Sequence, residues 1–234
     1  LGPVVLLEPR RVAARAAARR MAAERGERVG GSIGYSVRFD DKTSKATRVT
    51  AVTEGVFLRR VLEDPFLEGV GCVVFDEFHE RHLDGDLALA LARRVQLEAR
   101  EDLRIVVLSA TIDPGPVAAF LGDAAVLESE GRLFPVETLH QPARGREPLE
   151  EQVVRAVEDV VGRLASGSED VGDMGRDSLV FLPGVGEIRR CAEALAGTAA
   201  RHGLELQQLY GDLDAKQQDA VLAERPAGAP RRIV

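Results

Sequence analysis

Hydrophobic and polar positions follow two alternating patterns along the chain, short apolar runs and longer segments with helical spacing. The apolar runs predict β-strands at Val4–Glu8, Arg48–Thr53, Cys72–Asp76, Arg104–Ser109 and Ala125–Leu127. The segments between them predict helices at Arg11–Arg25, Gly55–Leu62, Asp86–Arg100 and Gly115–Leu121. Strands that alternate with helices are typical of a doubly wound parallel sheet, so we expect an α/β domain.

The same alternation begins again in the second half of the chain. Val136–His140 predicts a strand that leaves the first domain, and the proline-containing segment 141–148 predicts a linker. Further elements are expected at Leu149–Leu164 (helix), Ala165–Asp177 (exposed loop), Ser178–Leu182 (strand), Val185–Ala200 (helix), Leu204–Leu209 (strand) and Ala215–Ala223 (helix). We therefore predict two parallel-sheet domains, residues 1–140 and 149–234.

Composition agrees with a soluble, cytoplasmic α/β protein. The 234 residues are 45% hydrophobic and 29% charged, enough for two buried cores. No apolar run approaches the ~20 residues of a membrane span. Cys72 and Cys191 lie in no metal-binding or redox spacing, so we interpret them as buried thiols of a reducing compartment.

The net charge of −7 is unevenly distributed along the chain. Residues 1–60 contain 13 Lys and Arg against 6 Asp and Glu, a surplus of +7, and the remainder carries −14. Arg10 and Arg11 lie at a predicted strand-to-helix turn, where side chains and helix N–H groups together can bind a phosphate. Arg15 and Arg19 follow Arg11 at intervals of four residues, and we expect them to form a solvated helix face.

An acidic pair follows the apolar strand Cys72–Asp76. Asp76 and Glu77 are adjacent, and a carboxylate pair at the end of a buried strand is the layout of the acidic motif of P-loop NTPases. In that motif the first carboxylate holds Mg²⁺, usually through water, and the second polarises the attacking water. A second apolar strand ends in Ser109-Ala110-Thr111, which a strand-helix-strand crossover would bring to the same sheet edge.

His79 allows two interpretations. It could be a structural side chain, or it could connect the nucleotide site to the Ser-Ala-Thr strand by hydrogen bonding, which we favour because both motifs end at one sheet edge. A zinc site with His82, Asp84 and Asp86 is not supported, because the metalloprotease pattern requires histidine at position 83, where the chain has Leu83.

These motifs together resemble those of the DEAH-box RNA helicases of superfamily 2. The resemblance rests on Asp76-Glu77-Phe78-His79-Glu80-Arg81, Ser109-Ala110-Thr111, Glu8-Pro9-Arg10-Arg11-Val12-Ala13-Ala14, Gly34–Phe39, Thr53–Phe57, Leu179–Gly184 and Leu209–Leu213. Phenylalanine between the carboxylates and the histidine is similar to the bacterial HrpB-type subgroup. The resemblance implies two incomplete RecA-like domains, ATP or another NTP with Mg²⁺ as cofactors, and single-stranded RNA, possibly DNA, as partner.

The resemblance also implies roles for individual residues. Asp76 and Glu77 would bind the nucleotide and its metal, Asp76 holding Mg²⁺ and Glu77 acting as general base. Ser109 and Thr111, together with His79, would couple hydrolysis to strand movement. The strand path would be lined by Arg10, Arg11, Thr53 and Glu54.

The phosphate-binding loop Gly-x-x-x-x-Gly-Lys-Ser/Thr is not present in the sequence. The only Lys-Thr pair, Lys42-Thr43, follows Asp41 rather than glycine. Because the family places this loop before the strand at Val4, and its arginine fingers after the strand that begins near Arg231, we expect an internal fragment that is inactive in isolation. The alternative is a catalytically inactive nucleic-acid-binding or scaffold module with the helicase fold.

Overall fold

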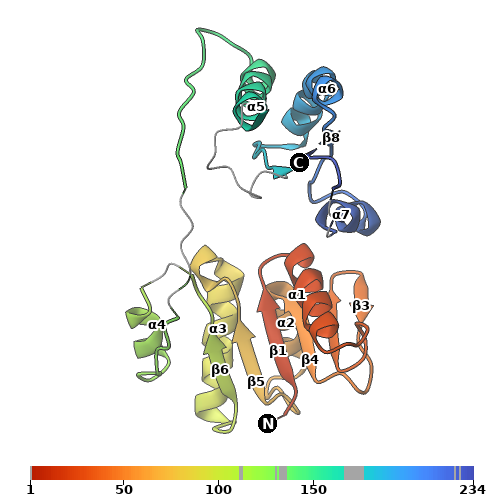
Figure 1. Cartoon of the computed structure of the whole chain (residues 1–234). Helices are drawn as coiled ribbons and strands as arrows, with labels where there is room; N and C mark the ends of the chain where they lie inside the picture. The colour runs from red at the N-terminus through yellow and green to blue at the C-terminus, as the bar shows by residue number, and fades with distance from the viewer. Residues whose placement is uncertain are drawn as a thin grey trace. The chain divides into compact units, whose positions relative to one another are not determined.

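The computed structural model describes residues 2–110, 113–129, 131, 136–165, 177–223, 225–226 and 228–234. The chain forms two compact units, residues 1–131 and 132–234 (Figure 1). The division between the units falls before the linker predicted at 141–148, whose bounds stay a prediction.

The first unit is built on a six-stranded sheet with the order β3-β2-β4-β1-β5-β6 (Figure 1). Its strands are β1 (Val4–Glu8), β2 (Ile33–Val37), β3 (Asp40–Lys42), β4 (Val49–Thr53), β5 (Cys72–Phe75) and β6 (Arg104–Val107). All neighbours pair in parallel except β2 and β3, which form an antiparallel hairpin. The register aligns Glu8 with Thr53 and Leu7 with Phe75, so the carboxyl ends of β1, β4 and β5 share one edge.

Helices cover both faces of this sheet. They are α1 (Arg11–Glu24), α2 (Glu54–Glu63), α3 (Leu83–Glu98) and α4 (Gly115–Phe120), and a 3₁₀ turn, η1 (Phe78–Glu80), follows β5. Successive strand residues point to opposite faces, so Leu6 packs with alanines of α1 while Leu7 packs with Phe57 of α2 and Leu89 of α3. Alternation in the strands thus produces two cores, one on each side of the sheet.

Two strands lie where the sequence predicts none, β2 and β3. Strand β2 alternates buried Ile33, Tyr35 and Val37 with Gly34 and Ser36, and a glycine lowers strand propensity. The glycine is nevertheless needed, because a Cβ at position 34 would overlap the carbonyl oxygen of Lys42 in β3. Strand β3 is short, and all three of its residues are charged. Both features are typical of an edge strand, because they discourage pairing with another chain.

The predicted strand at Ala125–Leu127 is wrong. This segment has no regular structure, and the side chain of Leu127 is exposed to solvent. An apolar run this short has no neighbouring strand to pair with at that point of the described structure, where the sheet ends at β6.

The second unit contains α5 (Leu149–Ala165), α6 (Val185–His202) and α7 (Ala215–Leu222). Its sheet has the order β7-β9-β8, formed by β7 (Asp177–Ser178), β8 (Glu205–Leu206) and β9 (Arg232–Ile233), and all pairs are parallel. Its core gathers Val153 and Val157 of α5, Cys191 and Leu195 of α6, and Ile233 of β9. Helices α5 and α6 are also joined by hydrogen bonds from Thr198 and Arg201 to Glu158.

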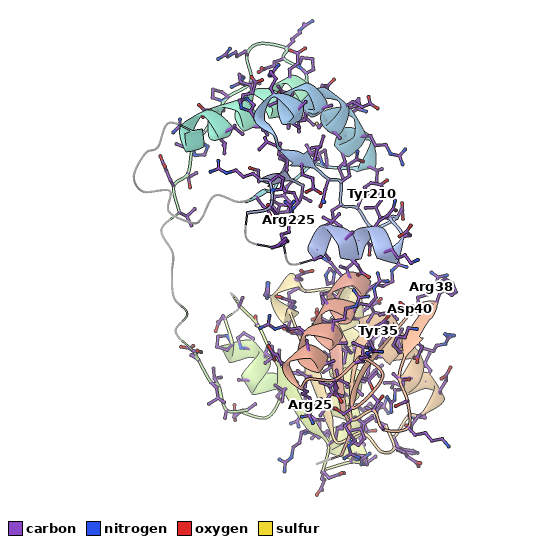
Figure 2. The ribbon with its side chains drawn as sticks, turned by 45° about the vertical axis from the view of Figure 1, so that its right-hand side comes forward. Arg25, Tyr35, Arg38, Asp40, Tyr210 and Arg225 are labelled. Atoms are coloured by element: carbon purple, nitrogen blue, oxygen red, sulfur yellow. The ribbon has the colours of Figure 1, made fainter. Side chains whose placement is uncertain are left out.

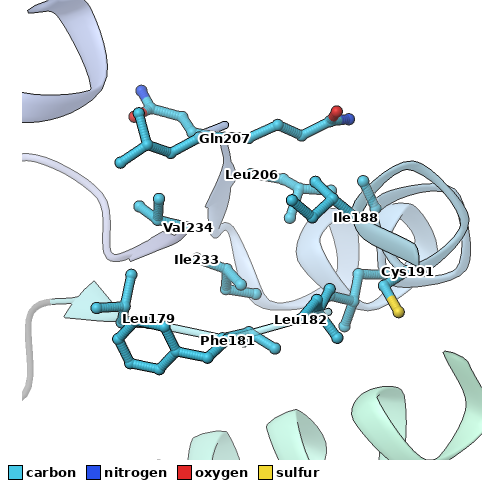
Figure 3. A pocket seen from close by; sticks show the side chains of 14 residues that line it. Leu179, Phe181, Leu182, Ile188, Cys191, Leu206, Gln207, Ile233 and Val234 are labelled. Carbon is cyan, nitrogen blue, oxygen red and sulfur yellow. The ribbon is translucent and has the colours of Figure 1, made fainter. Parts of the chain in front are cut away.

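The strands of the second unit are shorter than predicted. Strand pairing is limited to two residues in β7 and in β8, and the strand expected at Val136–His140 is wrong, because that segment is irregular and exposed. Leu179 and Phe181, which follow β7, line a pocket of about 160 Å³ together with Ile188 of α6 (Figure 3). Within the described residues, no helix is long and apolar enough to cross a membrane.

Candidate functional site

Strand β5 carries the acidic pair to the edge of the first sheet. Phe75 anchors the end of the strand in the core, where its ring meets those of Phe57 and Phe78 edge to face at 6.2 Å. The Asp76 N–H donates to the Leu7 carbonyl at 3.0 Å, which extends the pairing with β1 by one step. The chain then turns sharply at Glu77, whose φ of 51° is uncommon for a residue other than glycine. Such conformations concentrate at functional sites.

His79 lies between the acidic pair and the end of β6. Its Nδ1 accepts a hydrogen bond from the Ala110 N–H at 3.3 Å, and its Nε2 lies 3.2 Å from Oε2 of Glu77. Because Nδ1 is an acceptor, the neutral ring carries its proton on Nε2, the nitrogen that lies close to Glu77. The neighbouring backbone strengthens this connection, since the Phe78 N–H donates to the Leu108 carbonyl at 3.1 Å.

The structure brings most of the predicted catalytic residues together. Asp76, Glu77 and His79 lie on one turn. Ser109 directly precedes Ala110, whose N–H donates a hydrogen bond to His79. Thr111 lies outside the described residues.

Glu8 also belongs to this site, although the sequence prediction did not include it. It ends β1 beside Asp76 and is only 4% exposed. Burial, and then the negative charges of Asp76 and Glu77, raise the pKa of Glu8 from 4.5 to about 7. The sequence did contain an indication of this role, because Glu8 is a charged residue at the end of a predicted apolar strand.

The residues at this edge fit a magnesium ion. Three carboxyl groups, those of Glu8, Asp76 and Glu77, lie close together, and burial and then their mutual repulsion raise the pKa of Glu8. Hard oxygen donors are the ligands that Mg²⁺ prefers. The described residues contain no group of three or more side chains placed to enclose a metal by themselves.

The predicted nucleic-acid residues lie along the same edge. Arg10 precedes α1 and pairs with Glu80 of η1 at 3.0 Å, and Arg11 is the exposed first residue of α1. Thr53 precedes α2. Glu54 is directed toward the first turn of α3, since a Cβ on Gly85 would come within 2.6 Å of its Oε1.

Arg15 is not the solvated side chain that the helical spacing predicts. Its side chain is 13% exposed and lies 3.6 Å from Asp40 of β3, which also accepts a hydrogen bond from Tyr35 at 2.9 Å. Tyr35 and Asp40 are labelled close to each other in Figure 2. The expectation failed because the unpredicted strand β3 brings an acidic partner to this face of α1.

An exposed aromatic residue marks the β2–β3 hairpin. Phe39 is 91% exposed with a φ of 66°, and the guanidinium of Arg38 lies 4.8 Å from its ring centroid. Strand β2 runs parallel to β4 and ends at Val37, so this hairpin tip lies at the carboxyl edge of the sheet as well. The sequence offered no signal for this placement, because the hairpin itself was not predicted.

The fold and this site define a class of protein. A mostly parallel α/β sheet with an Asp-Glu pair, a histidine and a Ser-Ala segment at one edge is the RecA-like fold of the DEAH helicases. No protein-family model matches the chain.

The chain is homologous over its whole length to the HrpB and HrpA proteins. It is 42% identical over 233 residues to "ATP-dependent RNA helicase HrpB" of Escherichia coli (strain K12), covering all of this chain and 27% of that protein. It is 36% identical over 228 residues to "ATP-dependent RNA helicase HrpA" of the same organism, covering 97% and 17%. The crystal structure of Escherichia coli DEAH/RHA helicase HrpB aligns with a TM-score of 0.84 and 41% identity over the full chain and 28% of that structure. The predicted resemblance to the HrpB type is confirmed.

Proposed function

We propose that the chain is part of the motor of a longer ATP-dependent RNA helicase. One observation carries the proposal: His79 contacts Glu77 with one ring nitrogen and the Ala110 amide with the other. A residue pair suited to hydrolysis is thereby tied to a second strand end of the same sheet. The homology to named RNA helicases supports this function over that of an inactive scaffold module, although the chain spans about a quarter of HrpB.

In this function Asp76 would hold Mg²⁺, with water between them, and the ion when bound would neutralise charge on the nucleotide phosphates. Glu77 would act as general base on the attacking water. His79 Nε2 lies 3.2 Å from Oε2 of Glu77 and would help to orient this carboxylate. The link to Ala110 would transmit a change at Glu77 to Ser109 and Thr111.

The nucleic acid would follow the carboxyl edge of the sheet. Arg10 and Arg11, at the start of α1, would contact phosphates, and Thr53, which ends the neighbouring strand β4, would follow them along the edge. Phe39 extends this line on the other side of β4 and has the exposure needed to stack on a base. Backbone contacts carry no base identity, so we expect little sequence specificity.

We further propose single-stranded RNA as the principal partner and the cytoplasm as the place of action. The names of the relatives support RNA, and the two free, buried cysteines fit a reducing compartment. The domain division would be residues 1–140, a linker at 141–148, and residues 149–234.

The test is Glu77→Gln in the full-length protein. We expect ATP hydrolysis to fall by about 10² to 10⁴, since the base is lost while the shape is kept, and nucleotide binding to persist. Glu98→Gln makes the same change at an exposed carboxylate of α3 and serves as control. Near-normal hydrolysis by Glu77→Gln would favour the scaffold function instead.

A further inference from the structure

Arg10 and Glu80 form an ion pair between two segments that are 70 positions apart in the chain. Nη2 of Arg10 donates to both carboxylate oxygens of Glu80, each at 3.0 Å. Arg10 immediately precedes α1, and Glu80 is the last residue of η1. The Arg10 side chain is 71% exposed and that of Glu80 24% exposed. Ion pairs with this exposure contribute little to folding stability, because solvent screens the two charges.

Glu80 is held more firmly than Arg10. His82 Nε2 lies 3.0 Å from Glu80 Oε2, one of the two oxygens that Arg10 contacts. The 3₁₀ turn is anchored by Phe78, which is buried in the core against Phe75. The hydrogen bond to His82, and then the charge of Arg10, lower the pKa of Glu80, which keeps this carboxylate ionised. Glu80 is thus an anion in a fixed position, and the long, exposed side chain of Arg10 pairs with it.

The pairing leaves Arg10 able to bind a second anion. A guanidinium has five N–H donors, and Nη2 supplies only two of them. An exposed arginine whose position is already restricted loses less conformational entropy when it binds a phosphate.

We propose that Glu80 is a positioning residue for nucleic-acid binding, which fixes the Arg10 guanidinium so that its remaining donors meet a backbone phosphate. Because Glu80 follows His79 directly, one short turn then contacts the hydrolytic pair on one side and the phosphate-binding arginine on the other. The inference rests on the proposed nucleic-acid role of Arg10.

The test is a double-mutant cycle in the full-length protein with Glu80→Gln, Arg10→Ala and both together. Binding of a labelled single-stranded oligouridylate is measured over a range of salt concentrations. We expect Glu80→Gln alone to weaken binding about threefold or more and to reduce the slope of log affinity against log salt by up to ~0.7, the value of one single-strand phosphate contact. In the Arg10→Ala background it should have no further weakening effect, because Glu80 acts through Arg10.

A second readout is RNA-stimulated ATP hydrolysis. Glu80→Gln should raise the RNA concentration needed for half-maximal stimulation more than it lowers the rate at saturating RNA. Glu98→Gln removes an equal charge at the last residue of α3, roughly 22 Å along that helix from its first residue, and should change neither quantity.

The alternative is that Glu80 merely repels phosphate. In that case Glu80→Gln would tighten RNA binding in both backgrounds, and the inference would be overturned while the role of Arg10 stood. Equal weakening in both backgrounds would also overturn it and would indicate a general structural effect. If Arg10→Ala leaves affinity and salt slope unchanged, the inference fails together with the phosphate-binding role proposed for Arg10.

Discussion

The two units of the chain share an alternation of strands and helices but differ in how much of their sheet is enclosed. The first unit has six strands, with α1 on one face and α2 and α3 on the other, and each face has its own core. Among its described residues, the second unit has three short strands and one core cluster. Its Phe181 is 86% exposed, whereas Phe75 of the first unit is buried.

The difference shows how packing fixes the position of the sheet edge that carries the acidic pair. In the first unit, Phe75 is clamped between two aromatic rings one residue before Asp76, so packing fixes where the acidic pair emerges. In the second unit, β7 pairs over only two residues, and Phe181 lies past its end in a segment that lines an apolar pocket. Similar patterns in sequence thus produce a precisely held edge only where both sheet faces are packed.

The comparison predicts that aromatic truncation is costly only in the first unit. Phe75→Ala should lower the free energy of unfolding by about 3 to 5 kcal/mol, because it removes a buried ring and leaves a cavity. Phe181→Ala, the matched change in the second unit, should alter stability by less than about 0.5 kcal/mol. Urea unfolding followed by circular dichroism measures both. Equal losses would mean that the enclosure of the two sheets does not differ as described.

The crowded carboxyls of the first unit predict a dependence of stability on pH in metal-free buffer. The folded-state pKa of Glu8 is raised from 4.5 to about 7, so its favourable contribution is complete below pH 4.5 and is lost as the pH rises through 7. Glu8→Gln cannot ionise and should be more stable than the unchanged chain at pH 8 but not at pH 4.5. Thermal unfolding of both proteins between pH 4.5 and pH 8 tests this prediction. Glu63→Gln, on the exposed surface of α2, should leave the profile unaltered.

Two glycines sharpen the comparison with smaller effects. Gly34→Ala in β2 should destabilise the first unit by about 1 to 3 kcal/mol, because the new methyl group would overlap the Lys42 carbonyl and force the hairpin to shift. Gly197→Ala in α6 meets no atom within 4 Å and should stabilise the second unit by roughly 0.5 to 1 kcal/mol through helix propensity. We expect Gly34→Ala to lower the melting temperature and Gly197→Ala to raise it. A stabilising Gly34→Ala would contradict the close contact with Lys42.

Helices were predicted more accurately than strands, for a physical reason. The spacing that predicts a helix is local, so the predicted Arg11–Arg25 and Val185–Ala200 differ from α1 and α6 by one or two residues at an end. A strand depends on a neighbour to pair with. Ala125–Leu127 is apolar but has none among the described residues, and Asp40–Lys42 is charged but is paired with β2.

Composition and motif spacing by themselves determined the α/β class and the identity of the acidic pair, since Asp76 and Glu77 are adjacent at the end of an apolar strand. Only the tertiary structure decided the connections, because they join residues distant in the chain. His79 contacts Ala110, Glu80 holds Arg10, and Arg15 turns out to face Asp40. Glu8 likewise becomes part of the site only through the parallel pairing of β1 with β5, which places two carboxyl groups side by side in a partly desolvated edge. Pairing and burial of this kind depend on which strands become neighbours, and no local pattern encodes that choice.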